Sequence, residues 1–242
     1  MARFVLVHGA YGGAWCWEPV TAPLEAAGHS VETLDLPGAG DDETPVEGVT
    51  LESCAERVCA LLARRPEPAV LVGHSMGGVI ITQAAALAPE LVESLIFVCA
   101  FMPSDGQSLL DLTRLPEGKD DLIQANIVVE GDPPVAFLAE EATAEAIYNC
   151  CTAEQTAWAV ARRRPQPVAP FETPVRIDDA LLASIPRSYV VANRDQSIPP
   201  ALQRRMIREH PCRQVVELDT DHAPYLSATA GLVAALIALA ES

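Results

Sequence analysis

Short apolar segments alternate with amphipathic segments along most of this 242-residue chain, and this alternation limits the folds open to it. The apolar segments are nearly continuous, as in strands that are buried on both faces of a sheet. The intervening segments have helical spacing, because residues such as Leu51, Cys54 and Val58 fall on one face. The expected strands are 3–8, 30–34, 69–72, 92–99, 187–192 and 214–218, and the expected helices are 15–27, 50–64, 77–88, 199–210 and 227–241.

This order of elements predicts an α/β fold with a doubly wound, mostly parallel six-stranded sheet and right-handed crossovers. One long segment, 103–183, interrupts the alternation. It holds helical stretches at 136–148 and 154–164 with Pro-rich sequence beside them, at 132–134 and 165–167, and it is too long for a structureless loop. We therefore expect a core formed by 1–102 and 184–242, with 103–183 inserted as a mainly helical cap.

Composition excludes several classes of function. The net charge of −17 disfavours nucleic acid and anionic membranes as partners, and the basic run 162–164 is typical of a solvated helix end. The apolar runs are shorter than the roughly 18–20 residues of a membrane span, and the N-terminus lacks a signal-peptide pattern. Seven cysteines without a CxxC pair or zinc-like spacing indicate free thiols in a reducing compartment. We expect a cytoplasmic protein without metal or cofactor, whose apolar cap surface would allow a homodimer.

The strongest chemical signal is the motif GHSMGG at 73–78, between an expected strand and an expected helix. A serine on such a sharp strand-to-helix turn, a nucleophile elbow, is held with its hydroxyl exposed at the carboxyl edge of the sheet. The small residues Gly73 and Gly77 allow the tight turn. Because a serine hydroxyl is a weak nucleophile at neutral pH, Ser75 needs a base from elsewhere in the chain.

Among the five histidines, His222 is the best placed to be that base. It follows the last expected strand, and loops after parallel strands open at the same edge of the sheet. His74 lies inside the turn itself, so its side chain diverges from that of Ser75. We expect His8 to be structural, and we expect His29 and His210 to be solvated.

A carboxylate must fix the tautomer of such a histidine and stabilise its protonated form. Asp195 follows the preceding strand and completes the chain order Ser, Asp, His that is usual for this turn. Asp219 remains an alternative. Asp221 is adjacent to His222, which places its carboxylate badly for Nδ1 of that ring.

A glycine-rich stretch, 8–13, follows the first strand. Glycines there let the backbone approach a ligand and turn its N–H groups toward the same edge. We expect the amides of Ala10 and Met76 to form an oxyanion hole, in which each donor typically stabilises the transition state by about 3–4 kcal/mol.

Seven stretches of the chain form a specific pattern when taken together: 4–10, 13–15, 35–38, 73–78, 100–103, 198–200 and 221–222. The pattern resembles the α/β-hydrolase superfamily over nearly the whole chain. It is most similar to the branch of plant methylesterases, polyneuridine-aldehyde-type esterases and hydroxynitrile lyases with their bacterial esterase relatives. The resemblance implies a triad of Ser75, Asp195 and His222 with oxyanion donors at Ala10 and Met76.

The same resemblance distinguishes two chemistries. The lyases carry a threonine where this chain has Gly9, and a lysine after the catalytic histidine where this chain has Ala223. Lys119, in the expected cap, is the only lysine, so the cation that would stabilise departing cyanide is missing. Phe101 falls where relatives line the acyl pocket.

We therefore expect a serine carboxylic-ester hydrolase that cleaves a small or medium, largely apolar ester through an acyl-enzyme. Three alternatives remain at this point: a hydroxynitrile lyase, a hydrolase of lactones or polyketide intermediates, and a ligand-binding protein on a hydrolase scaffold. The first is disfavoured by Gly9 and Ala223. An intact triad weighs against the last.

Overall fold

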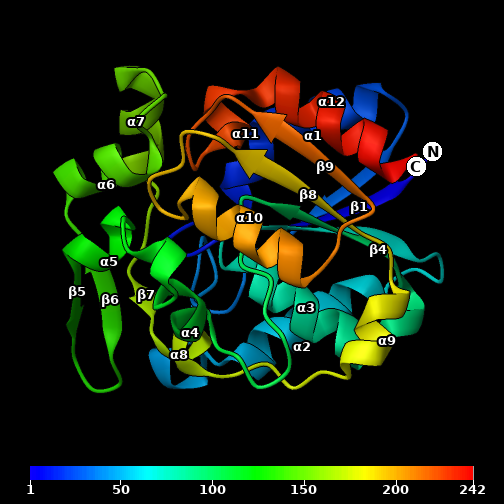
Figure 1. Ribbon diagram of the computed structural model, residues 1–242, viewed down its shortest axis with the longest axis horizontal. Coiled ribbons are helices and arrows are strands. Elements are labelled where there is room, and N and C mark those ends of the chain that lie inside the picture. Colours follow the sequence, from blue (N-terminus) through cyan, green and yellow to red (C-terminus); the bar gives the residue numbers. More distant parts are fainter. Residues whose placement is uncertain (242) are drawn as a thin grey trace.

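A six-stranded parallel sheet forms the centre of the protein, whose computed structural model describes residues 1–241 (Figure 1). In spatial order the strands are β2 (Ser30–Thr33), β1 (Arg3–Val7), β3 (Ala69–His74), β4 (Val92–Val98), β8 (Arg187–Ala192) and β9 (Gln214–Leu218). All five neighbouring pairs are parallel. The expected α/β fold with a doubly wound, six-stranded sheet is confirmed.

Helices cover both faces of this sheet (Figure 1). One face carries α1 (Glu18–Ala26), α11 (Pro224–Ser227) and α12 (Thr229–Ala240), and the other carries α2 (Leu51–Leu62), α3 (Gly77–Leu87) and α10 (Pro200–Glu209). Because successive strand side chains point to opposite faces, β1 supplies both apolar layers. Val5 and Val7 pack toward α2 and α3, whereas Phe4 and Leu6 pack toward α1 and α12.

Local signals explain most helix boundaries. Thr50 accepts a hydrogen bond from the N–H of Ser53 and donates its own N–H to the Ser53 hydroxyl, so this capping box starts α2 where expected. The expected helix 15–27 instead begins with a short 3-10 turn, Ala14–Trp17, before α1. The expected helix 227–241 is divided between α11 and α12. Further 3-10 turns occupy Val46–Gly48, Pro89–Leu91 and Pro116–Gly118.

The segment between β4 and β8 departs furthest from the sequence expectation. Its helices are α4 (Leu109–Thr113), α5 (Leu122–Asn126), α6 (Glu140–Ile147), α7 (Ala153–Val160), α8 (Ala169–Glu172) and α9 (Asp179–Ser184). It also contains a small antiparallel sheet of β5 (Ile127–Glu130), β6 (Val135–Leu138) and β7 (Gln166–Pro167). The predicted helix 136–148 is therefore wrong at its start, where three residues pair with β5 instead. Cross-strand pairing with the β-branched residues of β5 outweighs the helical spacing there.

Two histidines expected to be solvated are packed instead. His29 is 8% exposed, and its Nδ1 accepts the N–H of Ala2 at 3.1 Å. His210 is half-buried, with Nε2 3.1 Å from the Ser104 hydroxyl. Both partners are distant in sequence, so the chain pattern could not predict these contacts. Within the described residues, no helix combines the length and apolar character needed to cross a bilayer.

Candidate active site

The strand-to-helix turn between β3 and α3 presents Ser75 at the carboxyl edge of the sheet. Its φ of +54° lies in the left-handed region, which is strained for a residue with a side chain. The neighbouring chain holds this conformation, because the N–H of Ser75 donates to Val98 and its carbonyl accepts from Phe101. A Cβ on Gly77 would lie 2.7 Å from the Val7 carbonyl oxygen, so the turn can pass β1 this closely only with glycine there.

His222 links Ser75 to Asp195. Its Nε2 is 2.9 Å from Ser75 Oγ, and its Nδ1 is 2.7 Å from Asp195 Oδ2. Asp195 is 2% exposed, and its carboxylate also accepts from two backbone N–H groups and from the Gln203 amide. A carboxylate held in this way accepts the Nδ1 proton of His222, which leaves the Nε2 lone pair facing the serine hydroxyl.

Neither alternative acid is bonded to His222 in the described part of the chain. Asp221 is fully buried, but its carboxylate accepts from the N–H groups of Cys150 and Ala223 and from the Ser227 hydroxyl. Asp219 is exposed. The geometry therefore places Asp195, rather than either of these, beside the imidazole.

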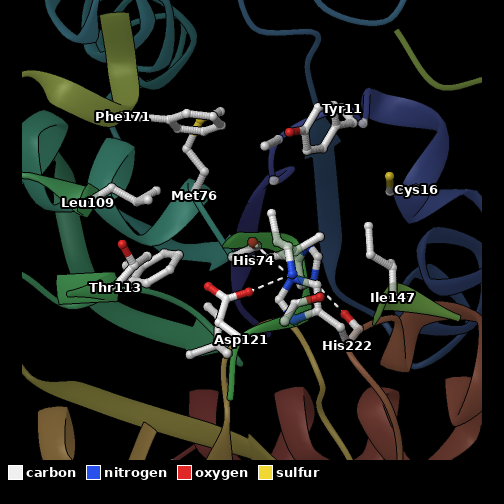
Figure 2. A pocket seen from close by; sticks show the side chains of 18 of the residues that line it. Tyr11, Cys16, His74, Met76, Leu109, Thr113, Asp121, Ile147, Phe171 and His222 are labelled. Atoms are coloured by element: carbon white, nitrogen blue, oxygen red, sulfur yellow. Dashed lines mark hydrogen bonds between the residues drawn. The ribbon is translucent and has the colours of Figure 1, made fainter. Parts of the chain in front are cut away.

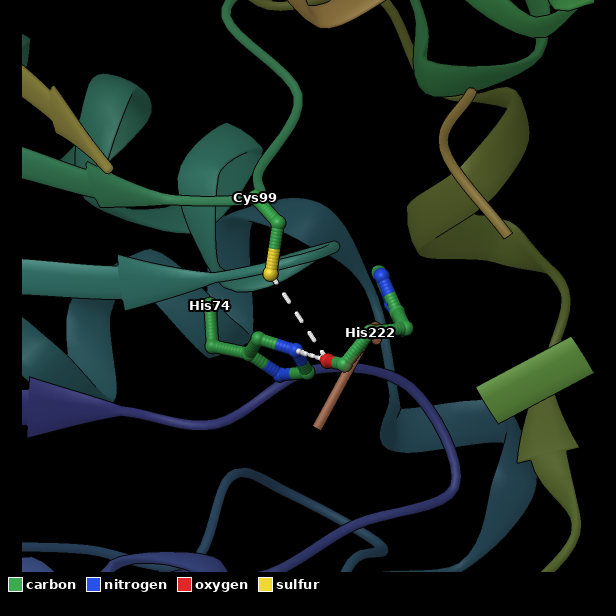
Figure 3. Close-up of side chains that lie close together, drawn as sticks. All are labelled: His74, Cys99 and His222. Carbon is green, nitrogen blue, oxygen red and sulfur yellow. Dashed lines mark hydrogen bonds between the residues drawn. The ribbon is translucent and has the colours of Figure 1, made fainter. Parts of the chain in front are cut away.

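The backbone of His222 is itself held in place by two buried side chains (Figure 3). Its carbonyl oxygen accepts from His74 Nε2 at 2.7 Å and from the Cys99 thiol at 3.6 Å. Burial and the nearby His222 keep the pKa of His74 well below its ordinary value, so His74 is a neutral donor. The ring of His74 thus points toward the backbone of His222 and not toward Ser75, and its hydrogen bond holds that backbone in place.

These three side chains, His74, Cys99 and His222, also bring ligand-type atoms within 4.8 Å of one another. A metal ion does not fit this arrangement. Both ring nitrogens of His222 are already engaged. Burial and the charges of Asp195 and Asp221 raise the pKa of the Cys99 thiol well above its ordinary value, which disfavours the thiolate that a metal requires.

Three other sequence candidates, His8, Ala10 and Met76, lie near this centre. His8 is fully buried; its Nδ1 donates to the Gly9 carbonyl and its Nε2 accepts from Leu36, so it ties together two loops at the sheet edge. Ala10 and Met76 both line the pocket over Ser75. Within residues 1–241 their N–H groups have no protein acceptor, which leaves both free to bind a ligand oxygen.

The pocket above Ser75 has two differently composed sides, with His222 between them (Figure 2). One side includes the apolar residues Met76, Leu109 and Phe171, together with Thr113 and Asp121. The other side includes Tyr11, Cys16 and Ile147. Phe101, expected to line an acyl pocket, is among the lining residues and is 5% exposed. Polar side chains that also line the pocket belong to Tyr148, Arg163, Ser197 and Tyr225.

Sequence analysis missed one acidic and one basic side chain in this pocket. Asp121 is 4% exposed; its Oδ1 accepts from the N–H groups of Ile123 and Gln124, and burial raises its pKa to about 7. Its position before a helix could have predicted a capping role, but not its place beside His222. Arg163 belongs to the basic run expected to be solvated, and that expectation is wrong for this residue, because it lines the pocket with its guanidinium over the Tyr11 ring.

Comparison with known proteins agrees with this architecture. A family model described as "Alpha/beta hydrolase family" matches residues 4–235, and the chain belongs to this family. Putative methylesterase 11, chloroplastic, of Arabidopsis thaliana is 34% identical over 98% of this chain, which spans 64% of that protein. Methylesterase 7 of the same plant is 32% identical, with 99% of this chain and 96% of that protein covered. The solved structure of a pyrethroid hydrolase from Sphingobium faniae JZ-2 superposes with a TM-score of 0.90 at 28% identity, over 100% of this chain and 98% of that one.

Proposed function

We propose that this protein is a cofactor-independent serine esterase in which Ser75 is the nucleophile. The observation that carries the proposal is the continuous hydrogen-bonded series from Ser75 through His222 to Asp195, at the floor of a largely apolar pocket. Membership of the α/β hydrolase family and similarity to proteins named methylesterases support ester hydrolysis as the reaction class.

In the first half-reaction, His222 Nε2 takes the proton from Ser75 as Oγ attacks the ester carbonyl carbon. The carbonyl oxygen becomes an oxyanion that accepts from the amides of Ala10 and Met76; removing one such donor typically costs about 3–4 kcal/mol of transition-state stabilisation. Protonated His222 then gives its proton to the departing alkoxide. The products of this step are an alcohol and an acyl-serine.

In the second half-reaction, His222 removes a proton from water, whose oxygen attacks the acyl carbon. The collapsing intermediate releases the carboxylic acid and returns the proton to Ser75. Asp195 stabilises the imidazolium in both steps without itself becoming protonated. The segment 103–183 acts as a cap, because Leu109 and Phe171 from it form an apolar wall that excludes water from the acyl group.

Two features argue against cyanohydrin cleavage at this site. Position 9 has no side chain, and a Cβ there would lie 2.7 Å from the Ser75 Cβ. Position 223 is a fully buried alanine, so it provides no cation next to His222. The arrangement therefore favours hydrolysis, which needs no side chain at position 9 and no cation at position 223.

The decisive experiment compares the wild-type protein with Ser75→Ala on a panel of methyl, aryl and lactone esters. We expect the variant to lose several orders of magnitude in kcat. Ser94→Ala, a half-buried serine on β4, is the control and should retain full activity. Retention of most ester hydrolysis by Ser75→Ala would overturn the proposal. A stoichiometric burst with a p-nitrophenyl ester and no steady turnover would instead identify a ligand-binding protein.

A further inference from the structure

Tyr11 and Arg163 present two buried donors on one side of the pocket that the protein itself leaves unused. Tyr11 is 5% exposed, and among the described residues its hydroxyl has no hydrogen-bond partner. The Nη2 atom of Arg163, a partly buried side chain, is also buried and has no hydrogen-bond partner there. Native proteins satisfy most buried polar groups, so a pair of unsatisfied donors lining one cavity calls for a ligand with acceptor atoms.

The two side chains are held in place by contacts from several segments. The guanidinium carbon of Arg163 lies 4.5 Å from the centroid of the Tyr11 ring, and its Nη1 donates to the Thr143 hydroxyl in α6. Tyr11 has a strained φ of +62°. Its N–H donates to the Gln166 side chain, and its carbonyl accepts the N–H of Arg164. These contacts keep both donors at the pocket.

None of the groups that the structure describes neutralises the guanidinium of Arg163. Arg163 takes part in no ion pair within residues 1–241. After burial, the groups that most affect the pKa of Arg163 are Tyr148, Tyr11, Tyr225 and Cys16. All four are neutral at physiological pH, because burial raises the pKa of each, to about 12 for Tyr11 and Cys16.

A buried cation without a counter-ion is unfavourable, and stacking on an aromatic ring offsets only part of the cost. Burial lowers the pKa of Arg163, yet a guanidinium keeps its proton at any physiological pH. Its planar fork matches a carboxylate better than any neutral acceptor. The overall charge of −17 does not prevent this, because charges on the surface are screened over about 10 Å whereas the buried cation is not.

We propose that Tyr11 and Arg163 form a carboxylate subsite, so that the substrate is an ester bearing a second, free carboxylate. This inference rests on the proposed esterase function, because the subsite and Ser75 line the same pocket. Figure 2 shows Tyr11 apart from Leu109 and Phe171, which lie to the left of it in this view. The substrate then lies across Ser75, with its anionic end toward Tyr11 and its apolar end toward Phe171.

Two pairs of matched esters test this, one for each side of the scissile bond. Monomethyl adipate is compared with methyl hexanoate, and 4-acetoxybenzoate with 4-methylphenyl acetate. We expect the wild-type protein to prefer the carboxylate-bearing ester in at least one pair by about tenfold or more in kcat/KM, as charged hydrogen bonds of this kind provide. Equal or lower kcat/KM for the anionic ester in both pairs would overturn the proposal without any variant.

Arg163→Leu removes the cation and Arg163→Lys keeps a point charge without the fork. We measure the preference as the ratio of kcat/KM for the anionic ester to kcat/KM for the neutral ester. We expect Arg163→Leu to abolish this preference by raising KM for the anionic ester, and Arg163→Lys to retain part of it. Arg162→Leu is the matched control, because Arg162 is exposed and stacks on Trp158 outside the pocket. A preference that survives in Arg163→Leu, or that is lost equally in Arg162→Leu, contradicts the assignment.

Binding to Ser75→Ala protein separates this subsite from the esterase function. Calorimetry with monomethyl adipate and with 4-acetoxybenzoate should show at least one of them binding about tenfold more weakly when Arg163→Leu is added to the Ser75→Ala protein. That result supports the subsite even if no ester is turned over by the wild-type protein, whereas unchanged binding of both refutes it. Conversely, rapid hydrolysis of the neutral esters with no effect of Arg163 leaves the esterase intact and removes the subsite.

Discussion

The buried carboxyl group of Asp121 makes the stability of this protein fall as pH rises through the neutral range. Its pKa in the folded protein is about 7, against an ordinary value of 3.8. Burial dominates, and the two backbone N–H groups that donate to Oδ1 offset it only in part. Because the folded state binds this proton more tightly than the unfolded chain, the contribution is fully present below pH 4 and is lost as pH rises to 7.

The size of the effect follows from the two pKa values. At about 1.4 kcal/mol per pKa unit, the whole change amounts to about 4 kcal/mol, of which about 3 kcal/mol falls between pH 5 and pH 8. Asp121→Asn retains an oxygen that can accept from Ile123 and Gln124 but does not ionise. The free energy of unfolding of wild type minus that of Asp121→Asn should therefore fall by about 3 kcal/mol from pH 5 to pH 8.

Urea unfolding at half-unit intervals of pH measures this difference directly. Groups that titrate in both proteins cancel when the two curves are subtracted, so the difference isolates position 121. Asp219→Asn, at an exposed carboxylate, is the matched control and should give a curve parallel to wild type. Curves for wild type and Asp121→Asn that remain parallel from pH 5 to pH 8 would show that the carboxyl group does not titrate near neutrality.

Three further substitutions test the packing and the site. Gly78→Ala should destabilise the protein by about 3 kcal/mol or more in urea unfolding, because the new Cβ would lie 2.2 Å from the Phe101 carbonyl oxygen. The control Gly231→Ala, whose Cβ would have its nearest neighbour at 3.4 Å, should be neutral or stabilising. Equal losses of stability in the two variants would contradict this reasoning. Asp195→Asn should lower kcat by about four orders of magnitude while Asp219→Asn leaves it unchanged, and the reverse order would reassign the acid. His74→Gln should lower kcat about tenfold with KM little altered, as for a group that only positions the His222 backbone; a rise in KM alone would point to substrate contact.

Much of the architecture follows from local pattern. Apolar runs and helical spacing predict the six strands and their covering helices, because the spacing of apolar residues along the chain follows from which face of each element is buried. The motif around Ser75 predicts a strained turn at the sheet edge, and the structure places it there. His222 and Asp195 follow the last two strands, and the carboxyl ends of parallel strands meet at one edge. Their proximity to Ser75 was therefore predictable.

Other features depend on contacts that no local pattern contains. Chain order favours Asp195 over Asp219, but the donors that hold the Asp195 carboxylate beside His222 come from Ser197, Ile198 and Gln203 and are visible only in the structure. The strand β6 replaces the first three residues of the expected helix 136–148 because β5 is available to pair with it.

The chain order by itself determined an α/β sheet with a serine, a histidine and an acid at one edge, because strand period, turn chemistry and parallel topology are local or nearly local properties. The tertiary structure alone decided the polar lining of the pocket. Asp121 and Arg163 belong to a segment whose elements pack over that edge from far along the chain. That packing decides whether such a charged side chain is exposed to solvent or lines a cavity, and the residues next to it in the sequence do not predict this.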